Sequence, residues 1–200
     1  MKKVHVFAGN DGLRPAMNYV QFKNGHFYAT DAHIAGKFRS DAVFELEGMP
    51  DEFYILAKDF KAMHSINPIG FELKDGIIKV FGKKSNFLCP FLTRDQFTQK
   101  VGRYPDIDFV LESAGSNLKA GHIPNATYSA KLISRVSDGL GSDTISFYFG
   151  ETNTKAAFVL SNDLSESVCL AIIMPVYVPD EVHMAAKDRI TNMTQKKVNA

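Results

Sequence analysis

The sequence has no tryptophan, only two cysteines and almost no net charge. The small number of cysteines and the balanced charge each exclude some classes of protein. The 23 Lys and Arg nearly balance the 22 Asp and Glu, which excludes a protein that holds nucleic acid by bulk positive charge but leaves room for a local basic face. Cys89 and Cys169 lie far apart within apolar segments, a pattern that favours buried reduced thiols over a disulfide scaffold or a zinc site. No segment reaches the ~20 apolar residues of a membrane span, and none has the pattern of a signal peptide. We therefore expect a cytoplasmic protein with no membrane partner.

What the sequence does contain is a series of short segments in which apolar and polar residues alternate, as in half-buried strands. Asn24-Gly25, between two such segments, predicts a tight hairpin. Strands are predicted at residues 4–7, 18–23, 26–30, 42–46, 70–74, 76–81, 86–92, 144–149, 156–161 and 167–174. Helical periodicity predicts helices at 56–66, at 125–138 with Asn125 as N-cap, and at 181–197. The predicted fold class is α+β, with short helices packed on antiparallel sheet.

The predicted elements form a repeat. One strand, one helix and three strands occur at 53–92 and again at 122–175. A Gly- and Ser-rich stretch at 113–121 separates the two occurrences and predicts a boundary. We expect a first domain at 1–112, a smaller unit at 113–178 and a C-terminal tail at 179–200 with helical periodicity.

Motifs for catalysis are scarce. Gly139-Leu-Gly141 lacks the spacing of a nucleotide-binding loop, and only Asp31 and His33 come close to an acid–base or metal-binding pair. The six histidines are scattered along the chain, so a third metal ligand is missing. We favour a structural turn at this position over an active site, and we expect no catalytic residue, no metal and no cofactor.

The basic residues form a pattern on the two longer predicted helices. Lys58 and Lys61 lie opposite the apolar stripe of the first helix, and Lys131 and Arg135 lie opposite the stripe of the second. A helix packed on a sheet normally has a charged outer face, so a solvated surface is one interpretation. Contact with phosphate groups is the other, and the repetition of the pattern in both units supports it.

Three stretches of the chain carry a family resemblance. They read Asn24-Gly-His-Phe-Tyr-Ala-Thr-Asp-Ala-His-Ile-Ala35, Gly102-Arg-Tyr-Pro-Asp-Ile-Asp-Phe-Val-Leu111 and Ala171-Ile-Ile-Met-Pro-Val176. These stretches resemble, in the same order, the Ala-Thr-Asp-Gly-His-Arg-Leu-Ala, Gly-Arg-Phe-Pro-Asp-Tyr and Met-Pro-Met stretches of the bacterial DNA polymerase III beta subunit, the sliding clamp. The resemblance implies a DNA-clamp-like fold. Residues 1–112 would match the middle of the family's three domains, and residues 122–176 the second half of the last.

The function that the resemblance implies is that of a processivity factor. Such a protein contacts duplex DNA without reading its sequence, tethers a DNA polymerase or another replication protein through a short peptide, and assembles into a homo-oligomer. The alternative is a truncated clamp-fold module that modulates replication proteins without encircling DNA. In the family, cations on the helices that line the ring contact DNA, and the matching residues here are Lys58, Lys61, Lys131, Arg135 and Arg14.

The resemblance also implies a pocket that captures the partner's peptide. Carried over residue by residue, its wall consists of Thr30, Ala32, His33, Ile34, Val110, Leu111, Ile172, Met174 and Pro175. Ile34-Ala35 and Tyr177-Val178 stand where the family has Arg-Leu, so the predicted pocket is apolar and lacks part of the family's polar rim. The alternative is that these side chains only fill a core between sheets.

Overall fold

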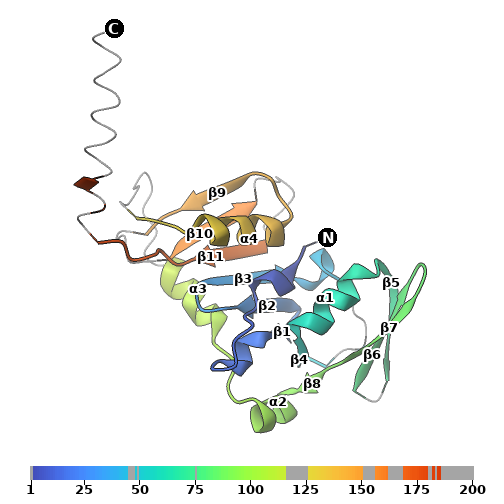
Figure 1. Ribbon diagram of the computed structural model, residues 1–200. Helices are drawn as coiled ribbons and strands as arrows, with labels where there is room; N and C mark the ends of the chain where they lie inside the picture. Colours follow the sequence, from blue (N-terminus) through green and yellow to red (C-terminus); the bar gives the residue numbers. More distant parts are fainter. Residues whose placement is uncertain are drawn as a thin grey trace.

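The computed structural model describes residues 2–44, 48, 50–74, 76–115, 126–150, 156–161, 169–179, 182 and 184–185. The described helices are α1 (Ala57–Ser65), α2 (Arg94–Lys100), α3 (Ile107–Gly115), α4 (Ala130–Leu140) and the 3-10 helices η1 (Val4–Phe7), η2 (Pro15–Asn18) and η3 (Ser40–Ala42) (Figure 1). The described strands are β1 (Tyr19–Lys23), β2 (His26–Thr30), β3 (Ile34–Arg39), β4 (Glu52–Leu56), β5 (Pro68–Lys74), β6 (Ile77–Gly82), β7 (Asn86–Pro90), β8 (Leu92–Thr93), β9 (Ile145–Tyr148), β10 (Ala157–Ser161) and β11 (Cys169–Ile173). This mixture of helix and antiparallel strand confirms the predicted α+β class.

Most strands belong to one antiparallel sheet of eight, in the order β8-β4-β1-β2-β3-β11-β10-β9, and β5, β6 and β7 form a separate sheet of three. The predicted hairpin is confirmed: Asn24 and Gly25 both have positive φ, as a tight turn between β1 and β2 requires. In the middle of the large sheet β3 pairs with β11, from Ile34 opposite Ile173 to Phe38 opposite Cys169. The two units predicted from the sequence thus share one continuous sheet, while the boundary between them stays a prediction.

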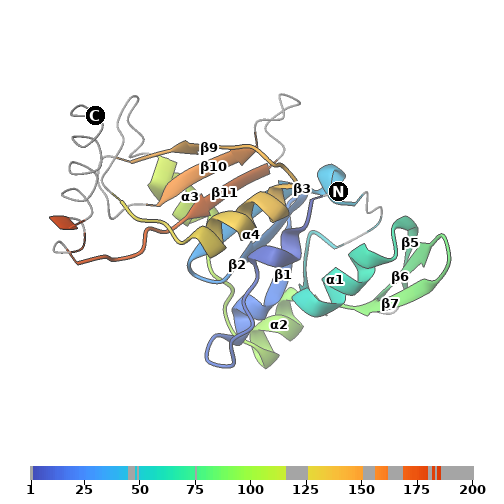
Figure 2. The same ribbon diagram turned by 45° about the horizontal axis from the view of Figure 1, so that its top comes forward.

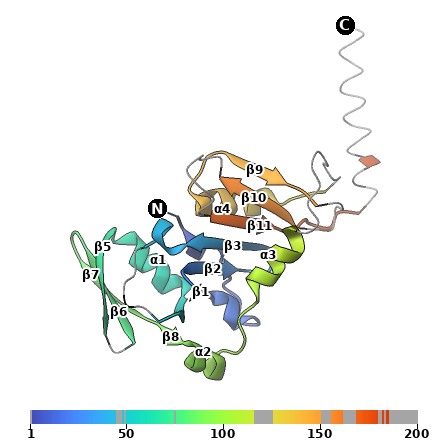
Figure 3. The same ribbon diagram turned by 180° about the vertical axis from the view of Figure 1, so that it is seen from behind.

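Helices cover both faces of the large sheet. Figure 2 shows α4, η1 and α1 side by side on one face, which we call the α4 face, and Figure 3 shows α3 on the opposite face, the α3 face. Successive side chains of β2 point to opposite faces of the sheet. Phe27 packs with Phe60 of α1, whereas Tyr28 packs with residues of α2 and α3. The α4 face and the α3 face therefore have separate hydrophobic cores.

The N-terminal element differs from its prediction. Residues 4–7, predicted as a strand, form the 3-10 helix η1, in which Val4 and Phe7 are both fully buried. Side chains three residues apart point the same way in a 3-10 helix, so this turn buries both residues between α1 and α4. The predicted strand at 42–46 is also wrong where it is described, because residues 40–42 form η3 and a turn follows.

Several elements were absent from the sequence prediction or have shifted bounds. Strand β3 and helices α2 and α3 were not predicted, and β4 was predicted only as the first strand of the repeat that begins at residue 53. Helix α4 begins at Ala130 after Ser129 as N-cap, so Tyr128 precedes the helix and packs beside Phe147 and Phe149 instead. The predicted N-cap Asn125 lies outside the described residues, as does most of the predicted helix at 181–197.

The first occurrence of the predicted repeat is confirmed. Strand β4, helix α1 and strands β5, β6 and β7 follow one another, and later α4 is followed by β9, β10 and β11. Of the predicted first strand of the second occurrence, the described residues before α4 show one bridge, between Thr127 and Val176, and residues 122–125 lie outside the described residues.

Both cysteines are buried and free, as predicted. Burial raises the pKa of the Cys89 thiol to about 12 and that of Cys169 to about 11, so both stay protonated at neutral pH. Among the residues that the structure describes, no helix is long and apolar enough to cross a membrane.

Candidate functional site

A cleft of about 250 Å³ opens on the α3 face where the turn between β2 and β3, the start of α3 and the end of β11 meet. Its lining is mostly apolar and consists of Met17, Thr30, Ala32, His33, Ile34, Ala35, Pro105, Ile107, Val110, Ile172 and Met174. Residues that are more than 130 positions apart in the sequence thus share one cavity. Pairing of β3 with β11 brings them together, because Ile34 lies opposite Ile173.

The turn that forms one wall of the cleft is fixed by short-range hydrogen bonds. The Thr30 hydroxyl donates to the Ile34 carbonyl at 2.8 Å and accepts from the Ala32 amide at 3.1 Å. The Asp31 carboxylate accepts from the amides of His33 and Ile34, both at 2.9 Å. Between them Ala32 has a φ of 74°, a left-handed conformation that is costly for a residue with a Cβ.

The structure brings together most of the predicted pocket residues. Seven of the nine line the cleft: Thr30, Ala32, His33, Ile34, Val110, Ile172 and Met174. Leu111 instead packs in the core of the α3 face, and Pro175 follows the last cleft residue without lining it. Sequence reasoning missed Met17, Ala35, Pro105 and Ile107, although Pro105 and Ile107 lie within the 102–111 stretch that carried the resemblance.

A second cleft of about 490 Å³ adjoins the first and shares Pro105 and Ile107 with it. Its walls are polar, but the polar groups pair within the chain: Gln21 donates to Glu52, and Tyr54 donates to the same carboxylate. Burial, followed by the neighbouring Glu52, raises the pKa of the Tyr54 hydroxyl well above its usual range. These hydrogen bonds join β1 and β4 at one wall of the second cleft.

Four of the five predicted DNA-contacting residues are exposed, and Arg135 differs from them. Lys58 and Lys61 on α1 and Lys131 on α4 have exposed side chains, and within the described part of the chain none of the three forms an ion pair. Both helices lie on the α4 face (Figure 2). Arg14 is also exposed, but it precedes the single 3-10 turn η2 and lies on no α-helix.

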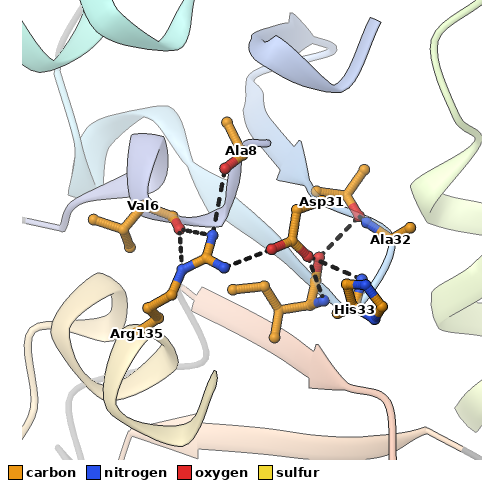
Figure 4. Close-up of polar contacts among 8 residues, drawn as sticks. Val6, Ala8, Asp31, Ala32, His33 and Arg135 are labelled. Atoms are coloured by element: carbon orange, nitrogen blue, oxygen red, sulfur yellow. Dashed lines mark hydrogen bonds and ion pairs between the residues drawn. The ribbon is translucent and has the colours of Figure 1, made fainter. Parts of the chain in front are cut away.

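Arg135 differs from the other predicted cations. Its guanidinium forms an ion pair with Asp31 and donates to the carbonyls of Val6 and Ala8, and only 29% of the side chain is exposed (Figure 4). The prediction that Arg135 lies on the solvent-facing side of its helix is therefore wrong.

The same contacts bear on the predicted Asp31 and His33 pair. Asp31 faces Arg135 and the amides of its own turn, whereas His33 lines the cleft. Among the described residues, no group of three or more His, Cys, Asp or Glu side chains could hold a metal ion.

His5 lies on η1 between the helices of the α4 face and makes stability depend on pH. Burial first, and then the charges of His64 and Lys61, lower its pKa to about 4, with Lys3 adding to the shift and Asp138 opposing it. Between pH 6.5 and pH 4 the unfolded chain binds a proton at this residue that the folded chain rejects, so the stability that neutral His5 permits is lost as pH falls through this window.

We expect the substitution His5→Phe to remove this loss of stability at low pH. Lowering the pH from 7 to 4.5 should cost the wild type about 1 kcal/mol more unfolding free energy than the variant, because solvent around the partly buried ring screens part of the shift. Urea denaturation of both proteins at the two pH values measures the difference, because carboxylates common to both cancel. Equal losses in the two proteins would show that His5 titrates as it does in the unfolded chain.

Comparison with known proteins shows the fold. No family model and no curated protein matches the sequence. Among solved structures, the DNA polymerase sliding clamp from Pseudomonas aeruginosa matches with a TM-score of 0.60 at 13% identity, over 88% of this chain and 62% of the clamp. The clamp from Bacillus subtilis matches with 0.58 at 13% identity, over 88% and 61%, and the DNA polymerase III beta subunit from Borrelia burgdorferi with 0.60 at 11%, over 88% and 61%.

These matches confirm the resemblance drawn from the three sequence stretches. The chain has the fold of the bacterial sliding clamps, at a sequence identity that speaks for the fold alone. It spans about 62% of the length of the Pseudomonas clamp.

Proposed function

We propose that this chain is a clamp-like, non-enzymatic replication protein that tethers a DNA polymerase or another replication protein by a short peptide and contacts duplex DNA without reading its sequence. The observation that carries the proposal is the apolar cleft, which is built from the 24–35, 102–111 and 171–176 stretches together. Clamps with the same fold bind small ligands: one from Pseudomonas aeruginosa was solved with griselimycin bound.

The chemistry of the cleft defines the ligand that it would take. Val110 and Met174 present apolar surface over the buried Ile172, and the Thr30 hydroxyl is already engaged within the turn. A cavity of about 250 Å³ accommodates one or two large apolar side chains rather than a whole folded element. The fitting ligand is therefore the apolar end of a short extended peptide.

Met174→Asp tests the cleft directly. A carboxylate introduced among apolar side chains must be desolvated when a peptide covers it, so we expect the affinity for a fluorescein-labelled octapeptide ending in Leu-Phe to fall about tenfold or more. Fluorescence anisotropy measures the affinity, and the unlabelled peptide serves as a competitor. The matched control is Tyr177→Ala, three residues further on, because that side chain is 88% exposed and lies outside the cleft. Equal affinities for Met174→Asp and the wild type would place the peptide elsewhere.

The proposed DNA contact rests on the α4 face. Lys58, Lys61 and Lys131 are exposed there, and the N-terminal Lys2 and Lys3 lie beside α4, where Lys2 donates to the Leu140 carbonyl. Lysines that contact phosphate groups attract any duplex equally and carry no sequence information, which suits a protein that moves along DNA.

A second function is favoured by one specific observation. Arg135 is engaged inside the protein, which leaves fewer cations on the α4 face than the sequence predicts. This favours a module that binds replication proteins without encircling DNA. Light scattering of the purified chain and DNA binding at low salt distinguish the two functions. An oligomer that binds duplex DNA supports the clamp, whereas a monomer that binds the peptide and not DNA supports the module.

A further inference from the structure

One partly buried ion pair links the α4 face to the wall of the cleft. Arg135 Nη1 lies 2.5 Å from Asp31 Oδ2, while Nε and Nη2 donate to the Val6 carbonyl at 3.1 and 2.6 Å and Nη2 also reaches the Ala8 carbonyl at 3.3 Å (Figure 4). The side chains of Arg135 and Asp31 are only 29% and 13% exposed. One guanidinium therefore connects three segments: η1, α4 and the turn between β2 and β3.

The two oxygens of Asp31 face different partners. Oδ2 faces Arg135, and Oδ1 accepts from the backbone amides of His33 and Ile34. The position of the carboxylate thus determines the position of the turn, and His33 and Ile34 of that turn line the cleft. The turn's own hydrogen bonds hold Ala32 at a costly left-handed φ of 74°, and the ion pair of Asp31 with Arg135 adds a support from outside the turn.

We propose that Arg135 is a positioning residue of the cleft. It holds Asp31 in place, Asp31 holds the His33 and Ile34 amides, and the cleft keeps the shape that receives an apolar side chain, although Arg135 itself touches no ligand. This inference rests on the proposed peptide-binding function and deepens it. It also assigns Arg135 to the cleft instead of to the DNA contact.

The competing account is that Arg135 only joins α4 to the N-terminal segment and has no effect on the cleft. The chain offers a matched control for this account. Lys3 and Asp138 form an ion pair at 2.5 Å that joins the same two elements, but it is exposed and has no link to the cleft. Asp138→Asn therefore removes an ion pair from the same helix without disturbing Asp31.

The binding experiment uses the labelled octapeptide ending in Leu-Phe. We expect Arg135→Met to weaken peptide binding roughly tenfold, Asp31→Asn to weaken it as well, and the double variant to bind no more weakly than the weaker single variant. Arg135→Lys, which keeps the charge but lacks the planar fork, should bind with intermediate affinity. Asp138→Asn should bind like the wild type. Additive losses at positions 31 and 135, or wild-type affinity in Arg135→Met, would overturn the proposal.

Hydrogen exchange without any peptide separates this inference from the proposed function. In Arg135→Met the amides of His33 and Ile34 should exchange faster than in the wild type, while the amides of the β1–β2 hairpin keep their protection. Arg135→Lys provides the same comparison if Arg135→Met does not fold. If the wild type fails to bind the peptide but the His33 and Ile34 amides still exchange faster in Arg135→Met, only the proposed peptide function is rejected. Unchanged exchange at both amides would reject the positioning role.

Discussion

Replacing Lys58, Lys61 and Lys131 together by glutamate is expected to lower the affinity for duplex DNA about a thousandfold at low salt. The three exposed lysines on α1 and α4 supply positive charge on the α4 face, and each reversal removes one phosphate contact and adds one repulsion. The loss should be the same for duplexes of unrelated sequence, because contacts to phosphate carry no base preference.

The salt dependence gives a second and independent measure. With the three lysines changed to glutamine, the slope of log affinity against log salt concentration should flatten by about 2.7, from about 0.9 for each phosphate contact. Fluorescence anisotropy with a labelled duplex over a salt series provides the slope.

The matched control places the same charge change on or beside α2, which lies on the α3 face. In Arg94→Glu/Lys100→Glu/Arg103→Glu all three positions are exposed, so the net charge falls equally without touching the α4 face. If both triple variants lose equal affinity, DNA binding reflects overall charge and the α4 face has no special role. If neither variant loses affinity, the result contradicts the proposed DNA contact and favours the protein-binding module.

The cleft was largely predictable from sequence because its residues lie in stretches that resemble a known family. Neither periodicity nor composition would have predicted that Thr30 and Met174 line the same cleft. The pairing of β3 with β11 brings them together. The residues that sequence reasoning missed, such as Met17 and Ile107, come from short elements that it did not predict.

Helix α2 shows how such an element escapes prediction. It has seven residues and buries only Phe97, so it has too few apolar positions to show a period. The available signal was its N-terminus, where Thr93 and Gln96 form a reciprocal capping box.

Arg135 could not have been placed from local sequence. Its spacing of four from Lys131 puts both residues on one side of α4, yet Lys131 is exposed whereas the Arg135 side chain bonds to other segments of the protein. The partners that draw Arg135 inward are Asp31 and the Val6 and Ala8 carbonyls, more than 100 residues away. A long-range ion pair of this kind leaves no periodic trace in the sequence.

Gly139→Ala is the second variant with a large expected effect, and two physical terms oppose each other in it. Alanine in place of glycine inside a helix normally stabilises it by about 1 kcal/mol. A Cβ at this position, however, would lie 2.2 Å from Cε2 of Phe7 and 2.8 Å from Cγ2 of Val6. Phe7 is fully buried and has no space to retreat, so we expect the clash to win and the variant to lose about 3 kcal/mol of unfolding free energy. Chemical denaturation measures this loss, and Ser134→Ala, at an exposed position of the same helix, should be as stable as the wild type or slightly more stable.

The outcome for Gly139→Ala also bears on the cleft, because α4 and η1 meet at this residue. The Lys3 amide donates to the Gly139 carbonyl at 2.9 Å, and η1 presents the Val6 carbonyl to Arg135. If the methyl group pushes η1 away from α4, Arg135 loses the Val6 acceptor and holds Asp31 less firmly. A folded Gly139→Ala should then bind the labelled peptide more weakly than Ser134→Ala, although neither position touches the cleft. Wild-type stability in Gly139→Ala would mean that η1 yields at little cost, and η1 could then not serve as the rigid support on which Arg135 depends.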